Sequence, residues 1–392
     1  MKVAVLFNRL GPYHWARLTA AAQTMPVAAI ELSADTKVAD TWENVGGPAC
    51  FARVTLFPEG DWRDVPVDEL VKRLETALDQ QRPAALAISG WSGNAAVAAL
   101  RWSVRRGVPV IMMSESTAVD DRRVAWKEWI KRCVLRLCQT GLVGGRRHAD
   151  YLAALGVPRE RIFVGYDVVD NEYFSTEADR ARQHAPKPDL PERFFLASAR
   201  FIPQKNLPGL LDAYAQYRER VAAAWDLVLL GDGPLKPNLC AQIAALKLQA
   251  HVHLPGFRQY RELPVYYAWA GAFVHASTVE PWGLVVNEAM AAGLPVLVSN
   301  RCGCAPDLVE EGRNGFSFDP GDVDELARLM ARVSSGELDL PAMGQASREI
   351  IRRWGPEAFA ANLQRAAETA VAARRPRAGV IERAVLWGLI HQ

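Results

Sequence analysis

The chain has 392 residues, half of them hydrophobic and 23% charged, which is enough for two domains with ordinary globular cores. A formal net charge of +2 argues against a dedicated nucleic-acid binder, and no finger or RNP-type motif is present. The six cysteines are scattered without a Cys-x-x-Cys pair, which indicates free thiols in a reducing compartment and argues against a metal site.

We expect no targeting segment at the amino terminus. Its apolar run stops at Asn8 and Arg9, which is too short for a signal peptide. No segment is apolar over the length needed to span a bilayer. We therefore expect a cytoplasmic protein that at most touches the inner face of a membrane.

The first half alternates short apolar runs with helical patterns. Strands are predicted at 3–7, 83–89, 108–114, 141–145 and 161–166. Helices are predicted at 15–24, 94–106 and 118–137. This alternation predicts a parallel sheet with helices on both faces.

Residues 176–192 change in character. They include three prolines and several charges but almost nothing large and apolar, which is typical of a linker. The alternation then resumes, with strands predicted at 194–200, 226–231, 251–256, 271–277 and 294–299 and helices beginning near 207, 235, 262, 284 and 323. The fold class is therefore α/β, with two doubly wound Rossmann-like domains at 1–175 and 190–372.

Two cations follow the first strand of the second domain. Arg200 ends that strand, and Lys205 lies in the loop after it. Ligands of open α/β sheets bind beyond the carboxyl ends of the strands, so both cations can reach one point and match a diphosphate. The alternative, two solvated surface charges, stays equally open.

Glycines follow the next two strands. Gly231, Asp232 and Gly233 end one, and Gly256 and Phe257 end the other. Glycine lets backbone approach a ligand closely, but a plain turn needs the same residues. These loops alone do not distinguish a binding site from turns.

The segment EPWGLVVNEAMAAG, residues 280–293, combines a helix start with two carboxylates. Gly283 precedes an apolar helix that begins near Leu284, so free N–H groups and the positive end of the dipole would face a negative ligand. Glu280 and Glu288 are acceptors suited to sugar and ribose hydroxyls. Glutamate is also common near helix starts, which is the plainer interpretation.

Several motifs are absent. No G-x-G-x-x-G follows the first strand, and there is no G-x-x-x-x-G-K-[ST]. The sequence therefore does not support a dinucleotide-binding oxidoreductase or a P-loop protein. No D-x-D lies in a loop at the end of a strand; Asp322 and Asp324 form a D-x-D, but it begins a predicted helix and is typical of N-terminal capping. No cofactor and no metal are expected.

The second half resembles the donor domain of a family 4 retaining glycosyltransferase with the GT-B fold, in which two Rossmann-like domains face each other across a cleft. The resemblance covers about residues 194–359. The segments that carry it are SARFIPQKN, EPWGLVVNEAMAAGLPVLVS with its Glu-x7-Glu signature, CAPDLVEEGRNGFSFDPGD, and YDVVDNEYF at the crossing between domains.

The resemblance implies roles for the residues that surround the transferred group. Arg200 and Lys205 would bind the diphosphate, and Glu280 would contact hydroxyls of the transferred sugar. The backbone N–H groups of Gly283 and Leu284 would lie near sugar or phosphate.

For the nucleotide, the resemblance implies that Glu288 holds the ribose. The pocket lining would be Gly231, Asp232, Gly233, Gly256 and Phe257. The family needs no metal and retains anomeric configuration by same-face attack, in which the leaving phosphate helps to deprotonate the acceptor. UDP is favoured over GDP.

The first half resembles the family more loosely. Gly11 is similar in place to the family's N-terminal glycine loop near the donor phosphates. Many members carry a sugar-facing His where this chain has Ser114–Ser116, so Glu115 and, on the acceptor side, His14 are the candidates. A C-terminal helix at about 373–392 is expected to pack back on the first domain.

The predicted helix at 118–137 carries Trp126, Trp129 and Ile130 among basic residues. Together with the apolar tail 384–392, it could contact anionic lipid. The other interpretation is a packed helix with a solvated basic face, and it is the one we favour.

The expected function is transfer of a hexose-type sugar from a nucleotide diphosphate sugar to a glycan, lipid-linked or other glycoconjugate acceptor, as in bacterial surface polysaccharide synthesis. Two alternatives stay open. A nucleotide-sugar epimerase of GT-B fold would need no acceptor, and a non-catalytic nucleotide-sugar-binding protein would fit the missing His.

Overall fold

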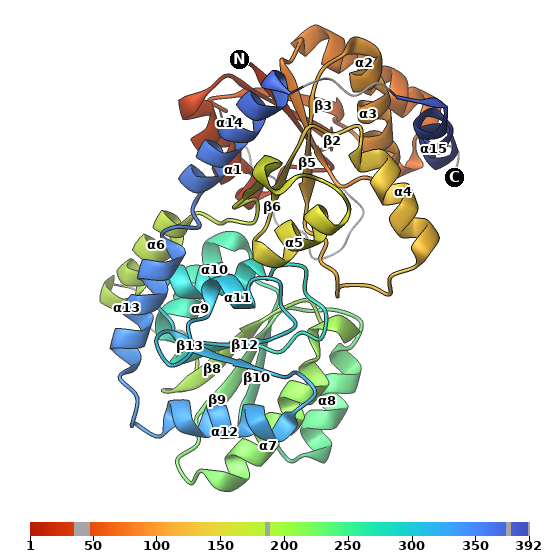
Figure 1. Cartoon of the computed structure of the whole chain (residues 1–392). Helices are drawn as coiled ribbons and strands as arrows, with labels where there is room; N and C mark the ends of the chain where they lie inside the picture. Colours follow the sequence, from red (N-terminus) through yellow and green to blue (C-terminus); the bar gives the residue numbers. More distant parts are fainter. Residues whose placement is uncertain (35–47, 185–188, 374–377, 391–392) are drawn as a thin grey trace. The chain divides into compact units, whose positions relative to one another are not determined.

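The computed structural model describes residues 1–34, 48–184, 189–373 and 378–390. The chain divides into two compact units, each built on one parallel sheet (Figure 1). Unit 1 comprises residues 1–168 and 356–392, and unit 2 comprises residues 169–355. Both are doubly wound α/β units, which confirms the predicted fold class of each domain.

Unit 1 contains a seven-stranded sheet in the order β3-β2-β1-β4-β5-β6-β7. Its strands are β1 (Val3–Phe7), β2 (Val27–Ser33), β3 (Ala52–Phe57), β4 (Ala85–Ser89), β5 (Val110–Ser114), β6 (Thr140–Val143) and β7 (Ile162–Val164). Its helices are α1 (Pro12–Thr24), α2 (Val67–Gln81), α3 (Asn94–Arg106), α4 (Ala125–Leu135), α5 (Arg146–Ala154), α14 (Pro356–Ala372) and α15 (Val380–Ile390). The strand order reverses between β1 and β4, which makes their carboxyl ends a switch point.

Unit 2 contains a six-stranded sheet in the order β10-β9-β8-β11-β12-β13. Its strands are β8 (Phe194–Ser198), β9 (Asp226–Leu230), β10 (Val252–Gly256), β11 (Ala272–His275), β12 (Val296–Ser299) and β13 (Gly315–Phe318). Its helices are α6 (Asn171–His184), α7 (Leu207–Arg220), α8 (Lys236–Ala245), α9 (Leu263–Trp269), α10 (Leu284–Ala291), α11 (Ala305–Leu308), α12 (Val323–Ser334) and α13 (Leu340–Ile351). Here the switch point lies between β8 and β11, so a ligand site is expected at their carboxyl ends.

The central strands are short apolar runs because helices cover both faces of each sheet. Every residue of β1, β11 and β12 is buried. In unit 2, one group of helices in contact consists of α7, α8 and α12, and it packs on the apolar core of the sheet. A second group in contact consists of α6, α9, α10 and α13. The start of α12 follows the expected capping, since Asp322 Oδ1 accepts a hydrogen bond of 2.8 Å from the Glu325 N–H.

The linker prediction is wrong for residues 176–184. These residues belong to α6, and residues 185–188 lie outside the described part of the chain. The inward face of α6 consists of Phe174, Ala178 and Ala181, so only one large apolar residue marks the helix in the sequence. The helix predicted at 118–137 also begins later, at Ala125.

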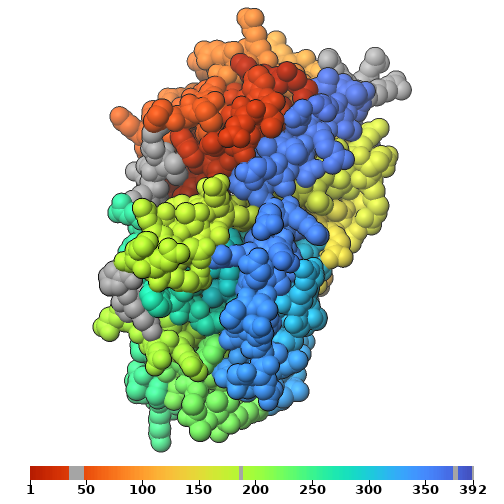
Figure 2. Space-filling view, turned by 90° about the vertical axis from the view of Figure 1, so that its left-hand side faces the viewer, coloured from red at the N-terminus to blue at the C-terminus, as the bar shows by residue number. Residues whose placement is uncertain are grey.

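The domain boundaries differ from the predicted limits at 175 and 372. The chain leaves unit 1 after Val168 and returns to it at Pro356, so α14 belongs to unit 1. Figure 2 shows this helix, in blue, alongside the red segment that contains α1. Its buried stripe includes Phe359 and Leu363, and its Ala366 carbonyl accepts a hydrogen bond of 3.2 Å from the Thr140 hydroxyl of β6.

In the stretches that the structure describes, no helix combines the length and the apolar character required to cross a bilayer.

Candidate active site

The loops at the carboxyl ends of β8, β9 and β10 form one hydrogen-bonded rim. The Gly231 N–H donates to the Gly256 carbonyl at 3.0 Å, and the Phe201 N–H donates to the Asp232 carbonyl at 2.8 Å. Backbone hydrogen bonds therefore join the three loops after β8, β9 and β10, which the sequence analysis names as candidate ligand-binding loops. The rim adjoins the switch point of unit 2, where the fold favours a ligand.

Steric contacts explain two of the glycines without a ligand. Gly231 has φ +127°, and a Cβ there would lie 1.9 Å from the Ala199 carbonyl oxygen. Gly233 has φ +152°, and its Cβ would lie 2.8 Å from the Phe201 nitrogen. Both glycines are thus needed for the close packing of two loops. Gly256 also has a positive φ, but open space surrounds its Cβ position.

Asp232 and Phe257 occupy different surroundings on this rim. The Asp232 carboxylate accepts the Gly233 N–H at 2.7 Å and pairs with Lys236 at 2.5 Å, and these contacts lower its pKa. Phe257 is half-buried in the loop after β10. Their predicted contacts with a nucleotide stay predictions.

Glu280 is the centre of a compact polar cluster. Three donors converge on its Oε2 atom: His275 Nε2 at 2.9 Å, Ser277 Oγ at 3.3 Å, and Lys205 Nζ. No described residue donates to Oε1. One oxygen is therefore fixed in position, while the other keeps its full capacity to accept hydrogen bonds.

Electrostatics keep this carboxylate ionised. Burial by itself would raise the pKa of Glu280, but the hydrogen bond and charge of His275, together with the charge of Lys205, lower it to about 2. At neutral pH the group is thus an acceptor and cannot supply a proton.

Gly283 lies directly beside this cluster. It has φ +106°, and a Cβ there would be 3.5 Å from Glu280 Cγ and 3.6 Å from His275 Nε2. The following residue, Leu284, begins α10. The sequence prediction that Glu280 stands beside the start of this helix is therefore confirmed.

The loop before α10 is held by the segment after β12. The Gly303 N–H donates to the Glu280 carbonyl at 3.0 Å, and the Cys304 N–H donates to the Trp282 carbonyl at 3.2 Å. Trp282 Nε1 also donates to Asn287 Oδ1 at 2.9 Å. These bonds fix the backbone on which Glu280 and Gly283 stand.

Glu288 is in a different environment from Glu280. Its exposed fraction is 0%, and its Oε2 accepts a hydrogen bond of 2.6 Å from the Tyr267 hydroxyl. Burial and the charge of Glu288 raise the pKa of Tyr260, whose ring stacks on Tyr173 at 5.0 Å. A ribose could touch this carboxylate only after the surrounding side chains moved, and its predicted role stays a prediction.

The two predicted phosphate-binding cations differ in their contacts. Lys205 lies in a 3₁₀ turn and pairs with Glu280. Arg200 is exposed, and no described residue forms a side-chain hydrogen bond or ion pair with it. The structure therefore brings Lys205 to a carboxylate and leaves Arg200 available to an anion.

The remaining candidates lie in unit 1. The Gly11 N–H, at the start of α1, donates to His14 Nδ1 at 3.1 Å, and the His14 ring lies 4.4 Å from Phe7. Burial and the charge of Arg17 lower the pKa of His14 to about 3, so its imidazole is neutral at physiological pH. Glu115 is exposed beyond β5.

His275 and Ser277 are cluster residues that the sequence interpretation misses. A signal exists: His275 ends a buried strand, and Ser277 and Glu280 follow it in the same loop. The candidates named from the sequence for the sugar-facing group, Glu115 and His14, both lie in unit 1. In the part of the chain that the structure describes, this cluster included, no group of three or more His, Cys, Asp or Glu side chains could hold a metal ion.

His275 should control the protonation of Glu280. Because its hydrogen bond is the largest influence that lowers this pKa, His275→Ala is expected to raise the Glu280 pKa from about 2 toward its ordinary value of 4.5. The stability contributed by ionised Glu280 is present above about pH 4.5 and is lost as pH falls toward 2, so the variant should be less stable at neutral pH.

Denaturant unfolding of the wild type and the variant across mildly acidic to neutral pH would measure this effect. His275→Gln, which keeps a donor but no charge, should show a smaller loss. Equal stability of wild type and His275→Ala throughout that range would contradict the coupling.

Part of the chain, including the residues of this site, is similar to a known protein family. Residues 179–350 match the family model of glycosyl transferases group 1. The alpha-monoglucosyldiacylglycerol synthase of Acholeplasma laidlawii is 29% identical over 163 residues, covering 41% of this chain and 40% of that protein. The GDP-mannose-dependent alpha-(1-6)-phosphatidylinositol monomannoside mannosyltransferase of Mycobacterium tuberculosis is 31% identical over 203 residues, covering 48% of this chain and 52% of that protein. The matches span about half the length of these curated relatives.

Solved structures with similar folds extend over nearly the whole chain. Anabaena HepE in complex with UDP has a TM-score of 0.70 at 19% identity, covering 95% of this chain and 100% of that one. Sucrose-phosphate synthase from Thermosynechococcus elongatus has a TM-score of 0.73 at 18% identity, with the same coverage. Residues 179–350 thus resemble the glycosyl transferases group 1 family, and the structural likeness identifies the fold of the chain as GT-B.

Proposed function

We propose that this protein is a retaining, metal-independent glycosyltransferase. It would move a hexose-type sugar from a nucleotide diphosphate sugar to a hydroxyl group of a glycan, lipid-linked or other glycoconjugate acceptor. The observation that carries the proposal is the Glu280 cluster, in which three donors hold one carboxylate oxygen and leave the other for a ligand. Glu280 and Glu288 form the proposed Glu-x7-Glu pair.

The cluster suits the recognition of a sugar. An ionised carboxylate accepts hydrogen bonds from hydroxyl groups, and Oε1 of Glu280 is the available acceptor. The start of α10, beside Gly283, offers backbone N–H groups and the positive end of the helix dipole to negative charge. Glu280 would thus orient the sugar while the helix start faces the diphosphate.

The cations suit departure of the nucleoside diphosphate. Arg200 is available to phosphate oxygens, and a diphosphate would compete with Glu280 for Lys205. As the bond between the anomeric carbon and the phosphate oxygen breaks, the acceptor oxygen bonds to the same face of that carbon. The acceptor proton passes to the departing phosphate. Positive charge matched to the phosphate as it leaves would stabilise this step.

The relatives suggest which substrates should be tested. One is named for dependence on GDP-mannose, and the Anabaena structure contains UDP, so both bases belong in the test, with UDP favoured. Two relatives are named for monoglucosyldiacylglycerol and for phosphatidylinositol monomannoside, and a third, from Erwinia amylovora and 30% identical over 203 residues, is named for amylovoran biosynthesis. A role in bacterial surface polysaccharide or glycolipid synthesis is consistent with those names.

A thermal-shift panel of nucleotides and nucleotide sugars, with EDTA or magnesium, is the first test. We expect one nucleotide diphosphate sugar to raise the melting temperature equally in EDTA and in magnesium. At about 100 times its Kd, such a donor would add about 2.7 kcal/mol of stability. Glu288→Gln should weaken this shift if Glu288 holds the ribose, and no shift with any nucleotide would contradict the proposal.

Product analysis with the stabilising donor separates the alternatives. Glycosylated acceptor with retained configuration supports the proposal. Donor consumed without any acceptor, and recovered as its epimer, would identify an epimerase instead. Tight donor binding without turnover on glycan and lipid acceptors would identify a binding protein.

A further inference from the structure

The exposed tryptophans are gathered in one part of unit 1. Among the described tryptophans, the three exposed ones are Trp126 (58%), Trp129 (50%) and Trp387 (62%). The first two lie on α4 and the third on α15, and these helices pack against each other (Figure 1). Large aromatic side chains left together on a surface mark a contact site.

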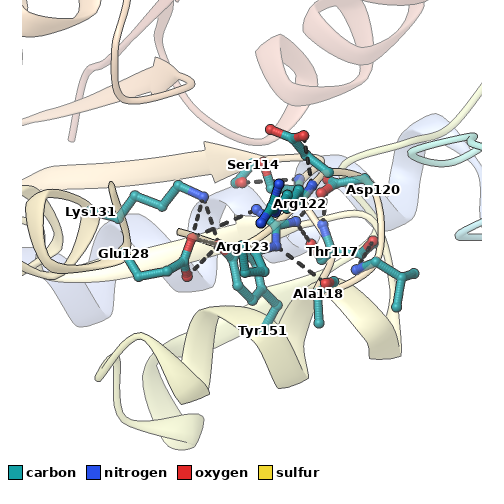
Figure 3. A network of polar contacts seen from close by, with 12 residues as sticks. Ser114, Thr117, Ala118, Asp120, Arg122, Arg123, Glu128, Lys131 and Tyr151 are labelled. Atoms are coloured by element: carbon teal, nitrogen blue, oxygen red, sulfur yellow. Dashed lines mark hydrogen bonds and ion pairs between the residues drawn. The ribbon is translucent and has the colours of Figure 1, made fainter. Parts of the chain in front are cut away.

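The inward face of α4 is fixed, so its tryptophans cannot turn inward. Lys131 Nζ donates to Glu128 Oε1 at 2.8 Å and to the Tyr151 hydroxyl of α5 at 2.7 Å. Arg123 pairs with Asp120, donates to backbone carbonyls of the preceding loop, and stacks over the Tyr151 ring (Figure 3). This network, made by Arg123 just before α4 and by Glu128 and Lys131 on it, anchors the inner face of α4 to α5.

The orientation of α15 is fixed as well. Leu386, Leu389 and Ile390 are buried in the core of unit 1. An ion pair of 3.6 Å joins Arg136, the C-cap residue of α4, to Glu382 in the first turn of α15. Trp387 stays exposed beside this buried face, and the first turn of α15 adds the exposed Val380 and Ile381.

Positive charge accompanies these apolar side chains. The exposed basic residues are Arg122, Lys127, Arg132, Arg136 and Arg383. The acids of the two helices, Glu128 and Glu382, are paired with Lys131 and Arg136, and Asp121 is the exposed acid in the preceding loop. Cations thus outnumber exposed acids around the tryptophans, which complements a negatively charged partner.

We propose that α4 and α15 form a membrane-docking surface that binds bilayers with anionic headgroups. Tryptophan favours the headgroup level of a bilayer, and Lys and Arg are drawn to anionic lipid. The helix is packed on one side, as favoured from the sequence, but its other side presents tryptophan as well as basic residues. The proposal concerns unit 1 alone and does not depend on the proposed transfer activity.

Vesicle flotation of the full chain tests this surface. We expect binding to vesicles of phosphatidylcholine with phosphatidylglycerol, a blue shift of tryptophan fluorescence, and weakening by salt. Vesicles of phosphatidylcholine alone should bind much less. The variant W126A/W129A/W387A is expected to lower the partition coefficient on anionic vesicles by about tenfold or more.

Two controls separate docking from general effects. V164A/V371A removes exposed apolar side chains from β7 and α14 of the same unit and should leave binding unchanged. The tryptophan variant should keep the wild-type melting temperature, because its side chains are exposed. K127E/R132E should weaken binding to anionic vesicles while leaving the tryptophans in place.

Three results would overturn the proposal. Equal binding by the wild type and the folded tryptophan variant would show that the three tryptophans do not form the membrane contact. No binding to anionic vesicles by the wild type would exclude the membrane. A dimer that the tryptophan variant loses in sedimentation, without any vesicle binding, would assign the surface to a second copy of the chain.

Discussion

Glu280→Gln is expected to lower kcat for sugar transfer by about 100-fold or more, while the protein stays folded. The substitution keeps the size of the side chain but removes the charge that Lys205 and His275 hold. Oε1 would remain available only as a neutral amide oxygen, or be replaced by the NH₂ group. Transferred product per folded enzyme, measured with the donor found in the thermal-shift panel, gives the effect.

The matched control is Glu349→Gln, which removes an ion pair with Arg313 on the exposed face of α13 in the same unit. It should leave kcat unchanged, because its carboxylate is exposed and contributes little. A Glu280→Gln enzyme with wild-type kcat would remove the main support for the proposed site. If only KM rose, Glu280 would contribute ground-state binding alone.

Gly231→Ala is expected to destabilise unit 2 by roughly 3 to 5 kcal/mol. A Cβ would meet the Ala199 carbonyl oxygen at 1.9 Å, and φ +127° is unfavourable for alanine. Either the loop after β8 or the loop after β9 must move, which would also displace the rim beside Arg200. For a unit of this size, the melting temperature should fall by about 10 °C.

Gly256→Ala is the matched control for this prediction. Gly256 also has a positive φ, +90°, but no atom lies within 4 Å of its Cβ position. Gly256→Ala should therefore lower the free energy of unfolding only through the unfavourable backbone conformation of alanine, by about 1 to 2 kcal/mol. Equal destabilisation by the two variants would mean that the contact with Ala199 is unimportant. Differential scanning calorimetry of both variants decides between these outcomes.

The sequence predicts the central strands well because their signal is local. β1, β8 and β12 are continuous apolar runs, and each can be recognised without knowing its neighbours. β2 and β3 are not predicted from the sequence, because polar residues inside the sheet interrupt their apolar pattern. Glu31 of β2 is fully buried, and it is satisfied by Arg53 and Thr55 of β3 at 2.7 Å each.

The unpredicted features depend on pairings between distant segments. The buried stripe of α14 looks the same in the sequence whichever unit it covers, so the boundary at 372 could not be corrected locally. Likewise, Lys205 shows no sign in the sequence that it pairs with Glu280, 75 residues further along. The site residues can be named from the sequence, but their partners cannot.

The discontinuity of unit 1 has a consequence for the order of folding during translation. Residues 1–168 leave the ribosome before unit 2, and α14 follows only after all of unit 2 has been made. Until then, the surfaces of α1 and β6 that α14 covers are exposed to water and to other chains. Unit 2, a single continuous stretch, can complete its core first. The nascent protein therefore passes through a stage in which unit 2 is folded and unit 1 still lacks α14. In that stage the chain is most prone to aggregation.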